Sequence, residues 1–362
     1  MNKIIYLDAA ASYLKSDAVI GAEVDFLRNF YANSGRGVCA RAAAVDDMVL
    51  RARKKVADFI GGAAENIAFI SGTTDAMNMI AKMLDIGQDT IVAVSDLDHH
   101  SARLPFEMAG GRVVKLPLDD EYNIDVAGIP YADVMVVTAM SNVMGVAQNV
   151  PEIVRIAREK NPNVVVVVDA AQYVVHDDID VRLWDADFVC WSGHKIGADT
   201  GIGVLYVKNP DAHKPVKFGG GMVQRVVDDG VLFVAGAEKF EAGTLPLTQI
   251  AGLGVAIDNI KQNRPNLELV KRLYDALSEM PRVRLISSRD AALVSFVVLD
   301  MHPLDFGALL GTRGVCVRVG NMCASWIHQR LGIAGSVRIS VGAYNTEQEI
   351  DTVIEYIKDI VK

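Results

Sequence analysis

Hydrophobic residues in the first two-thirds of the chain gather into short, nearly continuous runs separated by polar segments. Five consecutive valines occupy 164–168, and similar runs occur at 67–70 and 134–138. Short apolar runs rich in Val and Ile are typical of strands that are covered on both faces, whereas half-exposed strands alternate with polar residues. The pattern therefore predicts a buried, mostly parallel sheet.

Segments with helical periodicity lie between these runs. Residues 44–61 repeat apolar positions at helical spacing and end at a glycine pair, and residues 151–161 follow the same pattern. A regular exchange of strands and helices is typical of a sheet with helices packed on its faces. We therefore predict an α/β fold.

The last third of the chain has a different pattern. A long helix is predicted around 245–263, followed by a strand-helix-strand region and a final helix at 347–361. We predict three parts, namely an N-terminal segment at 1–15 that packs with the small domain, a large domain at 16–250, and a smaller α+β domain at 251–362.

Composition excludes some classes of function. The chain of 362 residues has a net charge of -9, and no block of Lys or Arg stands out. Nucleic-acid and anionic-membrane binding are therefore disfavoured. No apolar run approaches the roughly 20 residues of a membrane helix, and the N-terminus lacks the features of a signal peptide. The four cysteines have no zinc-site spacing, so we expect no metal and a cytoplasmic protein with reduced thiols.

Polar residues follow several of the predicted strands, where ligands bind in open α/β sheets. Thr73 and Thr74 begin a helix after one strand, and His99 follows the next. Hydroxyls at a helix N-terminus can bind an anion, although a simple helix cap is the alternative. A histidine there can stack on a flat ring or move protons, or it can be a solvated loop residue.

Two further strand ends carry charged residues. Asp169 ends the valine run, and a carboxylate there needs a cation or strong donors, with a helix cap or a structural ion pair as the alternative. Lys195 follows the apolar run at 188–191, and a desolvated lysine amine becomes a nucleophile. A phosphate site, a ring-stacking histidine, a carboxylate for a ring nitrogen and an imine-forming lysine together match the requirements of pyridoxal phosphate.

The chain resembles the class V aminotransferase family, fold type I of the pyridoxal phosphate enzymes, and within it the cysteine desulfurase and selenocysteine lyase branch. The resemblance runs nearly end to end through the motifs YLDAAAS, YANSGRGV, ISGTTDAMN, DHHS, SNVMGV, VDAAQ, SGHKIG, GIGVLYV, GGGM, FEAGT, VRVGNMCA and RISVGAYNTEQEID. It implies pyridoxal 5'-phosphate as cofactor, bound by a large domain with a mostly parallel sheet beside a smaller C-terminal domain.

The resemblance also implies a role for individual residues. Lys195 binds the cofactor covalently, Asp169 pairs with its pyridine nitrogen, Gln172 bonds its phenolic oxygen, and His99 stacks on its ring and takes part in catalysis. The phosphate is held by Thr73, Thr74, Ser192 and His194, with Thr244 reaching in from a partner subunit. Asn142 contacts the cofactor from the substrate side, and Arg318, Arg338 and Asn33 bind substrate, Arg338 by forking onto the α-carboxylate with Asn33 helping to orient it.

Cys323 lies in a predicted loop after a strand, near Arg318. A loop thiol beside a cation can be nucleophilic, and in this branch the cysteine at this position attacks the sulfur of the substrate. Inert packing is the alternative for a cysteine chosen without its motif. Cys190 and Cys316 lie in apolar strands and suit that alternative, while Cys39 is harder to place.

The match has two departures. Relatives typically have two histidines before the cysteine, where this chain has Asn321 and Met322, and a glutamate is common at Asp98. The change at Asn321 and Met322 affects the loop beside the thiol and so bears on the reaction, the substrate or the acceptor. It does not bear on cofactor binding.

The function implied is that of a homodimeric cysteine desulfurase. It converts L-cysteine to L-alanine, leaves a persulfide on Cys323, and supplies sulfur to an acceptor protein for iron–sulfur cluster or other thio-cofactor assembly. The alternatives that keep the cofactor are a selenocysteine lyase, a cysteine C–S lyase that yields pyruvate, an aminotransferase and an epimerase. A non-catalytic relative is disfavoured because the chain retains Lys195.

Overall fold

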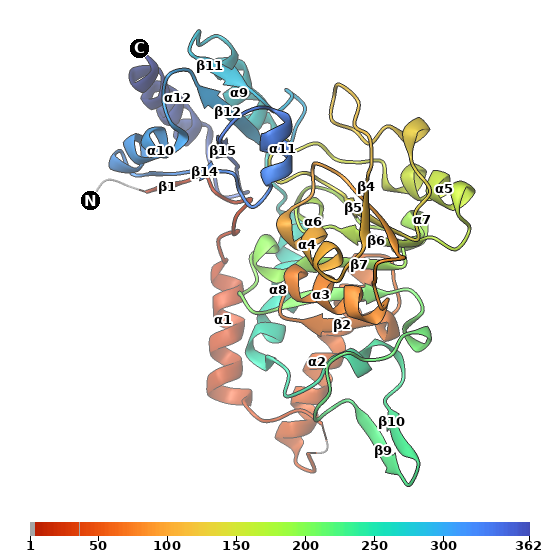
Figure 1. Ribbon diagram of the computed structural model, residues 1–362. Coiled ribbons are helices and arrows are strands. Elements are labelled where there is room, and N and C mark those ends of the chain that lie inside the picture. Colours follow the sequence, from red (N-terminus) through yellow and green to blue (C-terminus); the bar gives the residue numbers. More distant parts are fainter. Residues whose placement is uncertain (1–3, 36) are drawn as a thin grey trace.

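The computed structural model describes residues 4–35 and 37–362 (Figure 1). In this part of the chain, seven strands form the largest sheet. In spatial order they are β2 (Ile67–Ile70), β8 (Gly203–Val207), β7 (Phe188–Ser192), β6 (Val165–Asp169), β5 (Val134–Thr138), β3 (Ile91–Val94) and β4 (Arg112–Lys115). Only β8 runs antiparallel to its neighbours. The predicted α/β fold with a mostly parallel sheet is confirmed.

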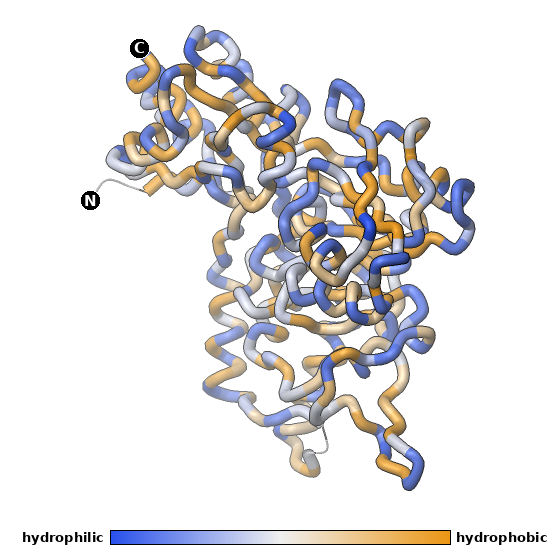
Figure 2. The backbone as a smooth tube through the Cα atoms, viewed as in Figure 1, coloured by the Kyte–Doolittle hydropathy of each residue, from blue (hydrophilic) through white to orange (hydrophobic). Residues whose placement is uncertain are grey.

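Helices cover both faces of this sheet, as the continuous apolar strands require. Their bounds are α2 (Ala40–Phe59), α3 (Thr73–Met83), α4 (His100–Met108), α5 (Val150–Lys160), α6 (Tyr173–His176), α7 (Val181–Trp184) and α8 (Leu247–Gln262). Figure 2 shows hydrophobic colour on the strands and blue on many connecting loops.

Alternate residues of each strand enter different hydrophobic cores, because side chains of a strand point to opposite faces. In β6, Val166 and Val168 pack with residues of α2, α5 and α8. The intervening Val167 packs with residues of α3 and α4, including Phe106. Burial on both faces explains why the sequence of β6 consists of consecutive valines rather than an alternating pattern.

The C-terminal part of the chain forms a separate antiparallel sheet. Its strands, in spatial order, are β11 (Val283–Leu285), β12 (Val294–Val298), β15 (Ser336–Ile339) and β14 (Arg318–Gly320). Around it lie α9 (Leu267–Ser278), α10 (Pro303–Thr312), α11 (Ser325–Arg330) and α12 (Glu347–Val361). Apart from α11, whose Ile327 packs in a separate cluster with Leu97 and Val143, these elements share a hydrophobic core in which the Phe296 and Phe306 rings meet edge to face.

The N-terminal segment crosses from the C-terminal part to the central sheet. Strand β1 (Ile5–Tyr6) pairs in parallel with β13 (Val315–Cys316), and α1 (Asp17–Asp25) then packs against α8. Helix α8 also packs along α2. The domain boundary that we place after residue 250 remains a prediction.

A hairpin of β9 (Val223–Val227) and β10 (Gly230–Phe233) projects from the central part, at the bottom of Figure 1. Among the described residues, no helix is both long and apolar enough to cross a membrane. The same residues contain no cluster of His, Cys, Asp or Glu that could hold a metal ion.

Candidate active site

A cavity of about 360 Å³ lies where the carboxyl ends of β2, β3, β5, β6 and β7 meet the C-terminal sheet. Its lining includes the predicted site residues Thr73, Thr74, His99, Asn142, Asp169, Gln172, Ser192, His194, Lys195, Arg318, Cys323 and Arg338. Parallel strands end at the same edge of a sheet, so strand-end residues that are distant in the sequence meet there.

Lys195 lies in the short helical turn Gly193–Ile196 that follows β7. Its Nζ donates a hydrogen bond to the Ala10 carbonyl oxygen at 2.6 Å. Burial, followed by the positive charge of Arg338, lowers the pKa of Lys195 to about 7, against the opposing effect of Asp169. A large fraction of this amine is therefore neutral, and nucleophilic, near neutral pH.

Asp169 is the last residue of β6 and is 4% exposed. One carboxylate oxygen accepts a hydrogen bond from the Ala171 backbone N–H at 2.9 Å. Burial raises the pKa of Asp169 to about 6, although the Ala171 hydrogen bond and the charge of Lys195 act in the opposite direction. A protonated ring nitrogen in the cavity would give this carboxylate the cationic partner that its burial demands.

An anion site lies at the start of α3. The backbone nitrogen and the hydroxyl oxygen of Thr73 both lie 2.9 Å from Ser192 Oγ. These hydrogen bonds join the start of α3, just after β2, to the end of β7. Gly72 has a φ of 150°, and a Cβ there would lie 3.1 Å from the Ser192 oxygen. His194 contacts the Ser12 hydroxyl at 3.3 Å, and burial followed by the charge of Lys195 lowers its pKa to about 4. Hydroxyls, a neutral ring and the helix N-terminus together suit a phosphate.

His99 caps the N-terminus of α4 with its own ring. Its Nδ1 accepts a hydrogen bond from the Ser101 backbone N–H at 3.2 Å. Burial, followed by the charge of Lys195, lowers the pKa of His99 to about 4. Because a backbone N–H can only donate, Nδ1 carries no proton, and the neutral ring keeps its proton on Nε2. His99 can therefore donate from Nε2 to a group in the cavity.

Asp98, at the first departure from the usual pattern along the chain, is fully buried and forms part of the turn before His99. Its carboxylate accepts hydrogen bonds from the Ser95 backbone N–H at 2.8 Å, the Ser95 hydroxyl at 3.0 Å and the Thr138 hydroxyl at 2.7 Å. Burial raises the pKa of Asp98 to about 7. Through these hydrogen bonds, the Asp98 carboxylate fixes the loop that carries His99.

Several buried polar atoms around the cavity have no partner among the described residues. They are Gln172 Oε1, Asn142 Oδ1 and Arg338 Nε. The rest of each group is anchored: Gln172 donates to the Ala10 carbonyl at 2.6 Å, Asn142 to the Met322 carbonyl at 2.9 Å, and Arg338 to the Asn142 carbonyl at 2.8 Å. Buried polar atoms are nearly always paired, so atoms like these mark places for ligand groups.

Cys323 lies in the tight turn between β14 and α11, and its side chain is exposed. Met322 and Cys323 both have left-handed backbones, with φ of 51° and 54°. Hydrogen bonds that hold the turn include Cys323 N–H to Asn321 Oδ1 at 3.2 Å, Ala324 N–H to the Asn321 carbonyl at 2.9 Å and His100 N–H to the Cys323 carbonyl at 2.7 Å. Asn142 also donates to the Met322 carbonyl. Asn321 thus caps the turn at the second departure from the usual pattern.

A second hollow, of about 550 Å³, adjoins the cavity on its outer side. Thr74, His99, Ser101 and Cys323 line both spaces, and the outer one continues along the apolar side chains of Leu104, Pro105 and Met108. The thiol of Cys323 therefore borders both the inner cavity and a space open to the surface.

Comparison with known proteins agrees with this geometry. The family model described as aminotransferase class-V matches residues 5–353. The chain belongs to the class V aminotransferase family. A probable cysteine desulfurase of Vibrio cholerae is 34% identical, with 99% of this chain and 94% of that protein covered.

Solved structures of cysteine desulfurases are also similar to this chain. The apo structure of the enzyme from Thermococcus onnurineus NA1 is 33% identical with a TM-score of 0.94, covering 99% of this chain and 95% of that one. A structure from Escherichia coli, described as an S-sulfonic acid form, is 31% identical with a TM-score of 0.90, covering 99% and 96%.

Two of the predicted site residues lie away from this cavity. Asn33 and Thr244 line a different cavity, of about 720 Å³, together with the buried ion pair of Arg53 and Glu241. Within one chain the structure does not bring them to Lys195. Asn33 thus lines the same cavity as Thr244, the residue that the resemblance implies reaches the site from a partner subunit.

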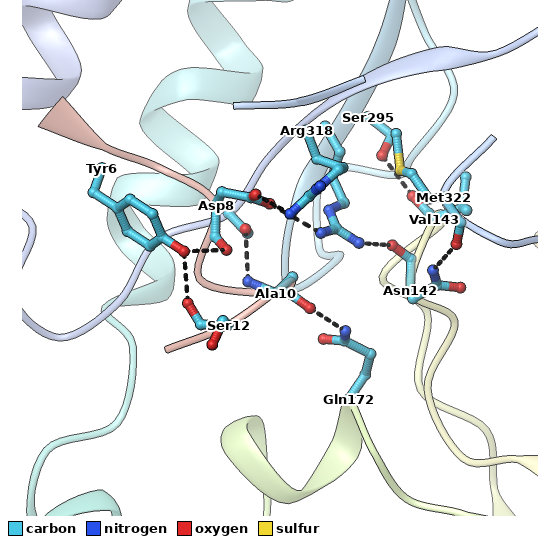
Figure 3. A network of polar contacts seen from close by, with 12 residues as sticks. Tyr6, Asp8, Ala10, Ser12, Asn142, Val143, Gln172, Ser295, Arg318 and Met322 are labelled. Carbon is cyan, nitrogen blue, oxygen red and sulfur yellow. Dashed lines mark hydrogen bonds and ion pairs between the residues drawn. The ribbon is translucent and has the colours of Figure 1, made fainter. Parts of the chain in front are cut away.

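Sequence reasoning assigned no role to Asp8 or Ala10, although both lie in the YLDAAAS motif. The Ala10 carbonyl accepts hydrogen bonds from both Lys195 and Gln172, each at 2.6 Å. Asp8 forms ion pairs with Arg318 at 2.6 Å and Arg338 at 3.2 Å (Figure 3). The signal for Asp8 is a carboxylate at the end of a short apolar strand, the same signal that identified Asp169.

Proposed function

We propose that this protein is a pyridoxal phosphate-dependent cysteine desulfurase. One observation carries the proposal: Cys323 lines the same cavity as Lys195, Asp169 and His99. A lysine, a carboxylate and a histidine suit the cofactor of the whole family, whereas a thiol at the mouth suits sulfur transfer. The cysteine desulfurases that resemble this chain over nearly its whole length support the same conclusion.

The lining residues fit pyridoxal 5'-phosphate. Thr73, Thr74, Ser192 and His194 would hold the phosphate, Asp169 the ring nitrogen and Gln172 the phenolic oxygen, with His99 against the ring. The unpartnered Gln172 Oε1 and the largely neutral Lys195 amine both agree with a bound group. When bound, the cofactor withdraws electrons from the α-carbon of an amino acid and so weakens bonds at that carbon and its neighbour.

The residues around this group supply the remaining chemistry. Arg338 binds the substrate carboxylate, and the neutral Lys195 amine and the Nε2–H of His99 can accept and donate protons in the cavity. Cys323 Sγ attacks the substrate sulfur, so that an S–S bond forms as the Cβ–S bond breaks. L-cysteine and one thiol give L-alanine and one persulfide, and no external oxidant or reductant is needed.

The position of Cys323 supports onward transfer of sulfur. Because the thiol borders the inner cavity and the outer hollow, a persulfide formed inside lies next to a space from which an acceptor thiol can approach. We propose such an acceptor, in iron–sulfur cluster or other thio-cofactor assembly. We also propose a homodimer, because Asn33 and Thr244 need a second chain to reach the cofactor site.

Product analysis tests the proposed function. The holoenzyme is incubated with L-cysteine and a reductant, and alanine, pyruvate and sulfide are quantified together. We expect alanine and sulfide in equal amounts without pyruvate. Pyruvate as the main carbon product would indicate a C–S lyase and would contradict the desulfurase assignment.

The lowered pKa of Lys195 predicts how cofactor capture depends on pH. A neutral amine reacts with an aldehyde and a protonated amine does not, so the reactive fraction grows as pH rises through the pKa and then levels off. With a pKa of about 7, the rate at which apo-protein captures pyridoxal phosphate should level off just above neutrality. Stopped-flow absorbance measures this rate; a rate that keeps rising towards the pKa of free lysine, about 10.4, would contradict the prediction.

The cap on the Cys323 turn predicts the effect of an Asn321→Ala change. The change removes the acceptor for the Cys323 N–H, so the left-handed turn loses a hydrogen bond of about 1 kcal/mol. We expect alanine formation from L-cysteine to slow about fivefold, with cofactor absorbance unchanged. Asn321→Asp, which keeps the acceptor oxygen, is the matched control and should retain most of the rate; equal losses in both variants would exclude the capping role.

A further inference from the structure

The carboxylate of Asp8 lies between two arginines of the cavity. Asp8 Oδ2 lies 2.6 Å from Arg318 Nη2 (Figure 3). Asp8 Oδ1 lies 3.2 Å from Arg338 Nη2. Asp8 is 6% exposed and Arg338 2%, while the Arg318 side chain is about half exposed. Each carboxylate oxygen thus serves a different guanidinium, and the buried arginine has the longer contact.

The backbone around Asp8 is fixed on both sides. Before it, the Leu7 N–H donates to the Cys316 carbonyl at 2.9 Å; after it, the Ala10 N–H donates to the Ser340 hydroxyl at 2.9 Å. Asp8 itself forms a parallel bridge with Ser340. The carboxylate therefore has a set position relative to β14 and β15, which carry the two arginines.

Arg338 is anchored by this carboxylate but not fully occupied. Its Nη1 donates to the Asn142 carbonyl at 2.8 Å, its Nη2 pairs with Asp8, and its buried Nε has no partner in the described part of the chain. Nη2 bears two N–H groups, of which the single Asp8 contact uses one. The Nε–H and one N–H of Nη2 thus have no acceptor among the described residues, and a second carboxylate would accept from both in the forked geometry that arginine prefers.

This arrangement differs from that of an ordinary structural ion pair. In a bidentate pair such as Arg53 with Glu241, the guanidinium faces the carboxylate through two nitrogens at 2.6 and 2.8 Å. Asp8 instead divides its oxygens between two cavity-lining arginines and leaves the fork of Arg338 open.

We propose that Asp8 is a positioning residue that aims Arg338 at the α-carboxylate of the substrate, while holding Arg318 beside it. The proposal rests on the proposed function only in that the substrate is an α-amino acid. Asp8 itself contacts neither the substrate nor the cofactor. Its removal leaves two arginines without their shared anion and lets the Arg338 fork turn away from the ligand.

The test compares two ligands that differ only in the carboxylate. L-alanine and L-alaninamide are titrated into holoenzyme, and binding is followed through the absorbance of the bound cofactor. For Asp8→Asn we expect the apparent Kd for L-alanine to rise about tenfold, as for a lost charge-assisted hydrogen bond, and that for L-alaninamide to change less than about twofold. Asp359→Asn, which removes an exposed ion-paired aspartate of α12, is the control and should change neither.

Two outcomes would overturn the proposal. An equal rise in the apparent Kd of both ligands would indicate a purely structural role for Asp8, and an unchanged Kd for both would show that Asp8 does not position Arg338. If Asp8→Asn does not fold, Asp8→Glu keeps the charge but displaces it by one methylene, and the proposal predicts an intermediate loss of selectivity for L-alanine. Because the titration requires no desulfuration, its result is independent of whether L-cysteine yields alanine. If wild-type protein binds L-alanine and L-alaninamide equally, the cavity does not recognise the carboxylate, and the proposal is wrong.

Discussion

Replacement of Lys195 by alanine is expected to abolish covalent capture of pyridoxal phosphate and to lower turnover of L-cysteine by about 10³-fold or more. The amine lies at a strand end inside the cavity, and burial with the charge of Arg338 keeps much of it neutral. No other lysine lines the cavity among the described residues, so none can substitute for it. Reduction of the holoenzyme with borohydride followed by peptide mass analysis would locate the bound cofactor.

A strand-end lysine outside the cavity provides the control for this experiment. Lys208 directly follows β8 and pairs with Asp185, so Lys208→Ala removes the same side chain from a comparable position. This variant should keep cofactor and turnover. Covalently bound cofactor in Lys195→Ala, at any other residue, would contradict the assignment.

Replacement of Cys323 by serine is expected to separate cofactor chemistry from sulfur transfer. Serine keeps the size of the side chain but cannot form a persulfide, so alanine formation should fall by at least about 10²-fold, as for loss of a nucleophile, while cofactor absorbance and L-alanine binding stay unchanged. The turn is anchored through the Cys323 backbone, so the substitution should leave its geometry in place.

Cys316→Ser is the matched control, because Cys316 is also an exposed thiol but does not line the cavity. It should retain the wild-type rate of alanine formation. A Cys323→Ser variant that forms alanine and sulfide as fast as the wild type would show that the sulfur does not pass through Cys323.

The central sheet and the strand-end residues could be predicted because local patterns encode them. The consecutive valines of β6 indicate a strand buried on both faces, and parallel strands must bring their carboxyl ends together. That rule brings Asp169, the last residue of β6, close to Lys195, which lies in the turn just after β7. The cysteine required its motif, because nothing in the local sequence distinguishes a thiol in a reactive turn from one that packs.

Contacts across distant segments could not be predicted in this way. The pairing of Asp8 with Arg338 depends on β1 joining β13, a parallel contact between the two ends of the chain for which a two-residue strand gives no register signal. The separation of Asn33 and Thr244 from Lys195 likewise depends on tertiary geometry. The capping role of Asn321 became evident only from the left-handed turn that it stabilises.

A single turnover without reductant tests most directly whether the substrate sulfur is transferred to Cys323. Holoenzyme is mixed with L-cysteine, free alanine is quantified, and the peptide containing Cys323 is analysed by mass spectrometry. The account predicts one alanine for each active site and a mass increase of one sulfur atom on Cys323 alone. Alanine formed without added sulfur on Cys323, or pyruvate in its place, would contradict it.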